Sequence, residues 1–173
     1  MVASSGVKWG EVGRCARTML LRLAQVGDLR GMFLGQFVHT LDSKGRLTIP
    51  AKFRAVLDSG LIVTRGIDRC LAIFPTAEWE DLAGRVSDLP MTDRQARAFK
   101  RFLFADASDV SPDKQGRILI PPRLRDYANL DGEVVVAGLN NYIEIWSTEA
   151  WHDEREQLEN DEVAIEGWAA LGI

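Results

Sequence analysis

Two short stretches of this sequence place an arginine directly after a turn that opens with an aspartate. Residues 42–54 read DSKGRLTIPAKFR, and residues 113–125 read DKQGRILIPPRLR. An aspartate can close such a turn with its own carboxylate, and glycine permits the positive φ that tight turns require. The following arginine carries a fork of N–H donors that matches O6 and N7 of guanine. The pattern therefore favours recognition of DNA, with each aspartate holding its arginine in place.

Further basic side chains near the two turns suit contacts with phosphate, which position a protein on DNA without reading its sequence. The expected DNA-binding residues are Asp42, Lys44, Arg46, Lys52, Arg54, Lys114, Arg117, Arg123 and Arg125, and Asp113 is the counterpart of Asp42. Arg46 is expected to matter more than Arg117, because the second stretch is expected to serve partly in assembly. One alternative stays open, in which aspartate and arginine pair only with each other as a structural turn.

The two stretches belong to an internal repeat, which is the strongest signal in the chain. Identical pairs at an offset of 71 (113 − 42) are Asp42/Asp113, Gly45/Gly116, Arg46/Arg117, Ile49/Ile120, Pro50/Pro121 and Arg54/Arg125, and Lys52 recurs as Arg123. Gly66, Leu71, Ile73 and Trp79 then match Gly138, Ile143, Ile145 and Trp151 at an offset of 72 (138 − 66). Such self-similarity indicates a duplicated supersecondary unit.

Each copy predicts a strand, a turn, a short strand ended by proline, a short helix, two strands and a last helix. The expected strands are 33–41, 46–49, 61–64, 71–74, 133–137 and 142–146, and the first short helix opens at Pro50 or Ala51. Expected helix caps are Thr76, Thr92 for a connecting helix within 91–106 with a basic outer face, and Ser147 or Thr148. Trp79, Trp146 and Trp151 are expected in the core, Cys70 as a buried inert thiol in a strand, and Arg94, Arg97, Lys100 and Arg101 on a solvated helix face.

Composition excludes several classes of function. The net charge is −4, but acids gather after Ala150 while bases gather around the repeated motif, so the local field favours a polyanion. No apolar run approaches the roughly 20 residues of a membrane-spanning helix. With two cysteines, two histidines and no phosphate-binding loop, the sequence predicts a cytoplasmic protein that is not an enzyme and uses no cofactor or metal.

The duplicated Asp-x-x-Gly-Arg, followed each time by Ile-Pro and a basic helix, resembles the AbrB-like swapped-hairpin transcription factors. Two such copies, the first starting Met32-Phe-Leu-Gly, are similar to the MraZ family. The resemblance implies an α+β fold of two tandem pseudo-symmetric β-α-β halves, with small sheets and flanking helices. The implied parts are a non-conforming extension at 1–31, a first SpoVT-AbrB-like repeat at 32–85, a connecting helix at 86–102, a second repeat at 103–155 and an acidic tail at 156–173.

The resemblance also implies a function and partners. It implies a nucleoid-associated regulator of transcription that assembles into rings and acts on the division and cell-wall operon containing its own gene. Its partners would be double-stranded DNA with repeated operator boxes and further copies of itself, with no membrane and no small-molecule substrate. An alternative stays open: antitoxins of the AbrB-like class bind a toxin through a tail, and the acidic tail here would suit that role.

Residues 1–31 have no repeat partner, and we expect translation of the folded protein to start at Met32. The boxes that this family binds upstream of its own gene resemble GTGGG. Codons for Ser5-Gly6, Lys8-Trp9-Gly10 and Val12-Gly13 permit that box from nucleotides 14, 24 and 34. Because ten base pairs make about one turn of B-DNA, the three boxes would face one side of the duplex.

Overall fold

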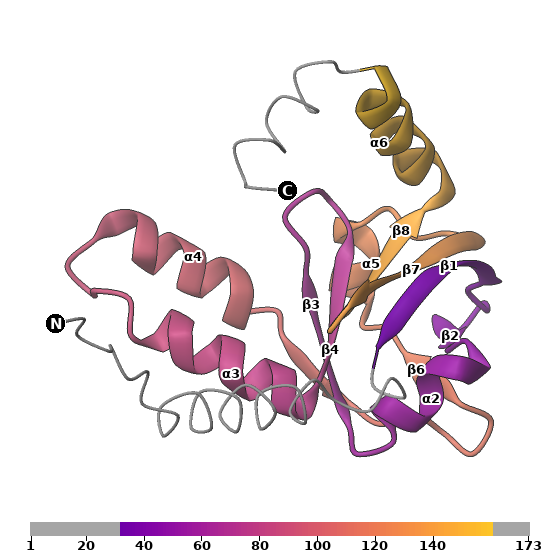
Figure 1. Ribbon diagram of the computed structural model, residues 1–173, viewed down its shortest axis with the longest axis horizontal. Helices are drawn as coiled ribbons and strands as arrows, with labels where there is room; N and C mark the ends of the chain where they lie inside the picture. Colours follow the sequence, from indigo (N-terminus) through magenta and orange to yellow (C-terminus); the bar gives the residue numbers. More distant parts are fainter. Residues whose placement is uncertain (1–31, 161–173) are drawn as a thin grey trace, which may run out of the picture. The chain divides into compact units, whose positions relative to one another are not determined.

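The computed structural model describes residues 32–160, and the expectations for residues 1–31 and for the end of the acidic tail lie outside them. Its elements follow the predicted order of strands and helices (Figure 1). The first copy holds β1 (Phe33–Thr40), β2 (Arg46–Thr48), α2 (Ala51–Leu57), β3 (Leu61–Arg65), β4 (Leu71–Pro75), α3 (Thr76–Ser87) and α4 (Arg94–Phe104). The second holds β5 (Ser108–Val110), β6 (Arg117–Leu119), α5 (Pro122–Tyr127), β7 (Glu133–Asn140), β8 (Ile143–Ser147) and α6 (Thr148–Asn160). The expected α+β class is confirmed.

The two copies are interlocked rather than placed side by side. A six-stranded antiparallel sheet has the order β1-β7-β8-β4-β3-β5, and β2 pairs with β6 in a separate two-stranded sheet. The first strand of each copy therefore pairs with a strand of the other copy, β1 with β7 and β5 with β3. The strand order is symmetric about the centre of the sheet, between β8 and β4. Within the first copy, β1 and β2 do not form a ladder with each other, and an isolated bridge joins Leu41, just after β1, to Leu47 of β2. This exchange is the swapped hairpin that the resemblance implied.

One hydrophobic core serves both copies. Its fully buried side chains come from both halves of the repeat and include Phe33, Phe53, Leu47, Ile49, Leu61, Ile73, Ile118, Ile120, Leu124 and Ile143. Phe53 of α2 meets Phe33 and Phe37 of β1 edge-on, at ring-centre distances of 5.2 and 5.4 Å. Since a copy alone would expose half of this cluster, the two copies must fold together.

Helix starts differ from the sequence-based expectation at two of three places. Thr76 lies inside α3, because Pro75 already has the extended backbone of a cap residue. α4 is capped by Asp93 rather than Thr92, and the Asp93 side chain accepts a hydrogen bond from the Gln95 amide at 2.7 Å. The expectation for α6 is confirmed, since Ser147 Oγ accepts from the Ala150 amide at 3.2 Å.

The expected core position is confirmed for Trp146, but Trp79 and Trp151 are only half-buried because they lie on α3 and α6, which face solvent on one side. Trp146 is 4% exposed and meets Trp151 edge-on, and Trp79 packs against Phe74 and Phe104. Cys70 is buried, although it precedes β4 instead of lying in the strand, and burial raises the pKa of its thiol to about 12. Within residues 32–160, no helix has the length and apolar character needed to cross a bilayer.

Candidate nucleic-acid interface

The ribbon formed by β2 and β6 brings the two predicted arginines onto one surface. Leu47 lies opposite Ile118, and both side chains are fully buried in the core. Side chains alternate along a strand, so the flanking residues face away from the core. The outward residues are Arg46 opposite Leu119 and Thr48 opposite Arg117. The ribbon therefore presents two arginines, a threonine and a leucine that is 55% exposed.

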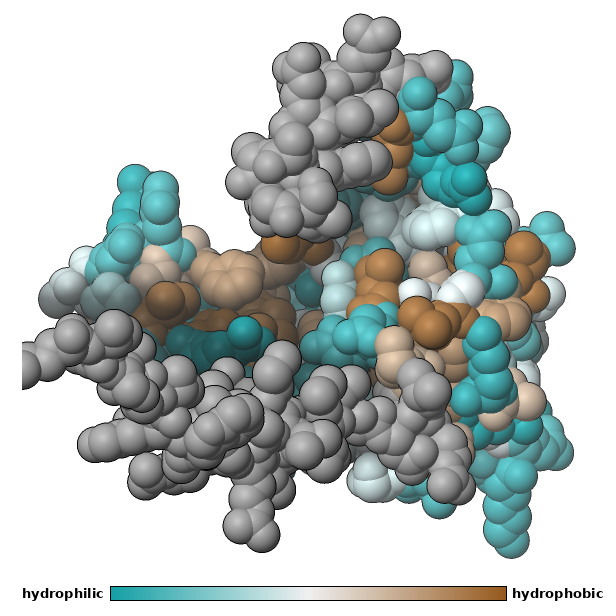
Figure 2. Space-filling view, viewed as in Figure 1, coloured by the Kyte–Doolittle hydropathy of each residue, from teal (hydrophilic) through white to brown (hydrophobic). Residues whose placement is uncertain are grey.

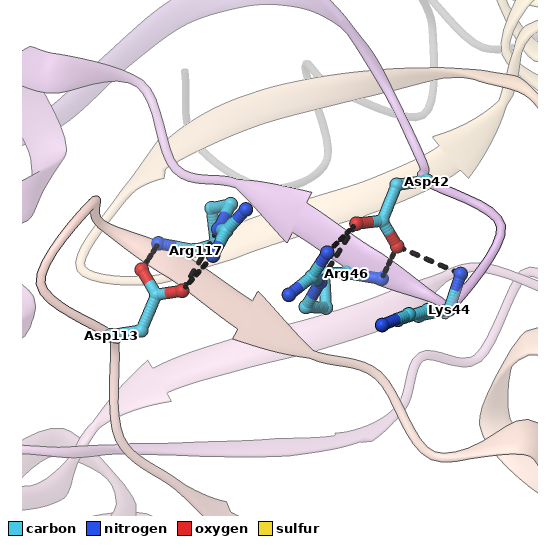
Figure 3. A network of polar contacts seen from close by, with 5 residues as sticks. All are labelled: Asp42, Lys44, Arg46, Asp113 and Arg117. Carbon is cyan, nitrogen blue, oxygen red and sulfur yellow. Dashed lines mark hydrogen bonds and ion pairs between the residues drawn. The ribbon is translucent and has the colours of Figure 1, made fainter.

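In the first turn, Asp42 organises both the backbone and the arginine (Figure 3). Its Oδ1 accepts hydrogen bonds from the backbone amides of Lys44 and Arg46, each at 2.9 Å. Its Oδ2 accepts a hydrogen bond from Arg46 Nε at 2.7 Å and forms an ion pair with Arg46 Nη2 at 2.7 Å. The first copy therefore contains the aspartate–arginine pair that the alternative interpretation, a purely structural turn, expects.

The second turn repeats this geometry. Asp113 Oδ1 accepts from the amides of Gln115 and Arg117 at 2.8 and 3.0 Å. Arg117 Nε and Nη2 donate to Asp113 Oδ2 at 2.8 and 2.7 Å. A guanidinium has five N–H donors, and each aspartate engages only two of its nitrogens on one edge. The pairing therefore fixes each guanidinium while leaving Nη1 and part of Nη2 for a further acceptor, and the expected ranking of Arg46 above Arg117 has no counterpart in this geometry.

The same contacts lower the pKa of both carboxyl groups. The side-chain hydrogen bond from Arg117 is the main cause that lowers the pKa of Asp113 to about 2, followed by the Arg117 amide. For Asp42 the main cause of the lowered pKa is the Arg46 amide, and the Arg46 side chain adds to it against an opposing effect of desolvation. Both carboxylates therefore stay ionised and hold their arginines across the physiological pH range.

Each turn is locked by an arginine of the other copy. Gly45 and Gly116 have φ values of +79° and +72°, which glycine adopts without strain. A Cβ on Gly45 would lie 2.7 Å from Arg125 Cζ, and one on Gly116 would lie 2.5 Å from Arg54 Nε. Reciprocal backbone bonds of 2.9 Å join Ile120 N to Gly45 O and Ile49 N to Gly116 O. Arg54 and Arg125 thus lie against the turns that carry the outward arginines.

The remaining predicted residues have different surroundings. Lys44 and Lys114 are exposed on the two turns. Lys52 and Arg123 occupy matching positions at the start of α2 and α5, but only Arg123 has a carboxylate partner, Asp106, among residues 32–160. The Lys52 ammonium instead lies 4.6 Å from the centre of the Phe37 ring.

The basic cluster on α4 does not join the ribbon site. Arg97 Nη1 donates to Met91 O at 2.6 Å, so this side chain ties down the connection between α3 and α4. Lys100 does the same by donating to Ser87 O and Leu89 O at 2.8 and 2.9 Å. The cluster is therefore partly structural, whereas we expected a freely solvated face.

Sequence reasoning missed three residues that belong to this surface or its surroundings. Thr48 and Leu119 were not singled out because their outward position follows only from the pairing of β2 with β6. Asp106 precedes the repeated motif, where the two copies have little identity. Extending the repeat upstream at the same offset would have aligned it with Gly35 (106 − 35 = 71).

Comparison with known proteins agrees with this architecture. The family model of the MraZ protein, described as antitoxin-like, matches twice, over residues 32–102 and 103–167. A protein of Herpetosiphon aurantiacus named Transcriptional regulator MraZ is 48% identical over 143 residues, which cover 82% of this chain and 100% of that protein. Proteins with the same name from Thermomicrobium roseum and Roseiflexus castenholzii are each 52% identical, over 73% and 70% of this chain and 89% and 85% of theirs. The chain belongs to the MraZ family.

Proposed function

We propose that this transcriptional regulator binds DNA in a sequence-specific manner by placing the β2–β6 ribbon in the major groove. The observation that carries the proposal is that Arg46 and Arg117 lie on the outward face of one ribbon, each held by its own aspartate. A two-stranded ribbon fits the major groove, and a fixed guanidinium can donate to O6 and N7 of guanine. Thr48 and Leu119 beside them offer methyl groups suited to the thymine C5-methyl.

Basic side chains around the ribbon would position it on the phosphate backbone. Lys44 and Lys114 extend from the exposed turns, and Lys52 lies in the first turn of the helix that follows β2. Arg54 and Arg125 lie against the turns, where they hold the ribbon in shape and add positive charge beside it. Such contacts set register and affinity, whereas base contacts set specificity.

The proposed operator is the set of G-rich boxes permitted by codons 5–13, which makes the protein a regulator of its own division and cell-wall operon. The test is a binding titration with a duplex carrying three GTGGG boxes ten base pairs apart, and a second duplex in which the boxes are scrambled. Wild-type protein should prefer the first duplex, and Arg46→Ala and Arg117→Ala should each weaken that binding by about 1–3 kcal/mol.

Arg85→Ala is the matched control, because Arg85 is an exposed arginine on α3, outside the ribbon and the helices that flank it. It should leave the preference for the boxes unchanged. If both ribbon variants bound the boxed duplex as tightly as wild type, the arginines would serve only to close their turns.

We also propose that the protein forms a homo-oligomer, with a ring closed by unlike surfaces of neighbouring subunits. β1 is an edge strand of eight residues, and its outward Leu34 and Val38 are 51% and 63% exposed. A long edge of this kind needs covering, and two unlike halves supply two unlike faces. Charge supports a contact between α6 of one subunit and α4 of the next. The α6 sequence is rich in acids and its surface is mostly hydrophilic (Figure 2), while Arg94 and Arg101 are exposed on α4.

Light scattering at micromolar concentration tests this assembly. The expected result is a multiple of 19.3 kDa, and Val38→Lys should shift the population toward smaller species because a charge on an edge strand opposes pairing. A wild-type protein that is monomeric at this concentration would contradict the proposal.

The rival function is that of an antitoxin-like protein that binds a toxin through acidic residues. The antitoxin-like description of the family and the acids on α6, such as Asp153 and Glu156, favour it. Purification from the native cell distinguishes the two functions. A small basic protein recovered in equal amounts would support the rival, whereas recovery of DNA carrying the boxes supports a nucleoid-associated regulator of its own operon.

A further inference from the structure

We propose that Asp106 withholds Arg123 from DNA, so that the two copies make unequal contacts with the phosphate backbone. The proposal rests on the proposed DNA-binding function and adds a positioning residue to it. Asp106 stands between α4 and β5, outside the repeated motif. Its role follows from its own contacts and from a comparison with the matching position of the first copy.

Asp106 is a nearly buried carboxylate between two guanidinium groups. Its side chain is 6% exposed, and its two oxygens lie 2.5 Å from Arg65 Nη2 and Arg123 Nη2. The Arg65 guanidinium also lies over the Tyr127 ring, with Cζ 4.8 Å from the ring centre. Arg123 is 76% exposed, but its charged end is held by a carboxylate that packing keeps in place.

The first copy lacks this carboxylate. At the offset of the repeat, Gly35 matches Asp106 and Lys52 matches Arg123. A Cβ on Gly35 would lie 3.4 Å from Lys52 Nζ, so a side chain at this position would reach the ammonium. Gly35 has a φ of +92°, a conformation that disfavours aspartate or any other side chain there.

The two basic residues therefore differ in what a DNA phosphate would have to displace. Lys52 lies over the rings of Phe37 and Phe53, at 4.6 and 5.3 Å, and a cation can keep such an interaction while it binds an anion. Arg123 would have to leave an ion pair of 2.5 Å with a carboxylate whose side chain is 6% exposed, and a nearly buried charge is costly to leave with less compensation. We therefore expect Lys52 to be available to phosphate, whereas the charge of Arg123 is already paired with that of Asp106.

The dependence of affinity on salt reports how many DNA phosphates a protein neutralises. In B-DNA, the slope of log K against log salt becomes shallower by about 0.9 for each phosphate that the protein no longer neutralises. With the boxed duplex as the probe, Lys52→Ala should reduce the slope by about 0.9 per bound subunit, and Arg123→Ala should leave it unchanged. Both side chains are exposed, so both variants should fold.

Asp106→Asn provides the converse test. It keeps an oxygen for Arg65 but removes the charge that holds Arg123. The ratio of affinities at 50 and 200 mM salt should then rise by about 3.5-fold per bound subunit, as one added phosphate contact requires. In an Arg123→Ala background the same change should have no effect, because the released group is gone.

Asp109→Asn is the matched control, since it removes an equal charge from an exposed position on β5 that makes no ion pair within residues 32–160. It should leave the slope unchanged. The proposal is overturned if Arg123→Ala lowers the slope as much as Lys52→Ala does, or if Asp106→Asn and Asp109→Asn act alike. A wild-type protein that does not distinguish boxed from scrambled duplex would instead overturn the proposed function.

Discussion

The two copies of the repeat keep the same turn but build different edges to the sheet. β1 pairs with β7 over eight residues, from Phe33 opposite Asn140 to Thr40 opposite Glu133. Its counterpart β5, a strand of three residues, pairs with β3. In the first copy Gly35 lies opposite Gly138, and a Cβ on Gly138 would lie 2.5 Å from the Phe33 carbonyl carbon. The long edge strand thus depends on glycine, whereas the second copy places the ion pair of Arg65 and Asp106 beside its short strand.

This contrast shows which part of a duplicated chain is free to diverge. Each turn rests on an arginine and an aliphatic-proline segment of the other copy, so a change in one turn disturbs both ends of the ribbon. The edges of the sheet are not joined in this way. One is a long exposed strand, and the other is a short strand beside an ion pair whose carboxylate is nearly buried. The ribbon that both copies build suits one shared function, whereas the unequal edge strands β1 and β5 suit different functions.

Truncation in the ribbon should affect the two copies equally and most strongly. Leu47 and Ile118 lie opposite each other and are fully buried. Leu47→Ala and Ile118→Ala should each lower the free energy of unfolding by about 2–5 kcal/mol, because each leaves a cavity in the shared core. Urea denaturation measures this. Two separate unfolding transitions would contradict a single core, since they would show that one copy survives the unfolding of the other.

A methyl group at Gly138 should disrupt the pairing of β7 with the long edge strand β1. Gly138→Ala forces the backbone of β1 away from β7, and we expect a decrease of about 1–3 kcal/mol in the free energy of unfolding. Hydrogen exchange should localise the damage to the amides near Phe33. Gly84→Ala is the control, because within residues 32–160 no atom beyond its chain neighbours and its own helix backbone lies within 4 Å of the added methyl. Alanine also favours the helix, so this change should stabilise the protein by up to about 1 kcal/mol. Equal destabilisation by both changes would refute the role of the close approach.

Titration of the two aspartates should reveal a small difference between otherwise matching turns. Both have a pKa below the ordinary value of 3.8, so their contribution to stability is present above that pH and is lost as the pH falls. For Asp113 the decline should extend to about pH 2. Carboxyl carbon NMR should show that Arg117→Ala raises the pKa of Asp113, and that Arg46→Ala raises that of Asp42 less because a backbone amide is its main cause. Two aspartates that titrate at 3.8 in the wild type would contradict both ion pairs.

Local elements could be predicted from the sequence because short-range chemistry determines them. Asp, Gly and Pro at fixed spacing predicted both turns and the helices that open after Pro50 and Pro121. The start of α4 was predicted wrongly because Thr92 and Asp93 are adjacent and both residue types can cap a helix.

The long-range pairing could not be predicted from the residues alone. An alternating strand shows which face is buried, but not which of several distant strands completes its ladder. The pairing of β1 and β2 with strands of the other copy was therefore not predicted, and the resemblance implied only a fold of the swapped-hairpin class. The shared ribbon face of Arg46 and Arg117, and the ion pair of Asp106 with Arg123, follow only from the folded structure.

The most direct test of the account is the specificity of a protein with Arg46→Lys and Arg117→Lys together. Lysine keeps the positive charge but lacks the planar fork that matches guanine. The ratio of affinities for boxed and scrambled duplex should fall by at least about tenfold, since removal of each bidentate pair costs about 1–3 kcal/mol. Binding to the scrambled duplex and its salt slope should stay unchanged. An unchanged ratio would contradict the claim that the two copies jointly read DNA through one ribbon.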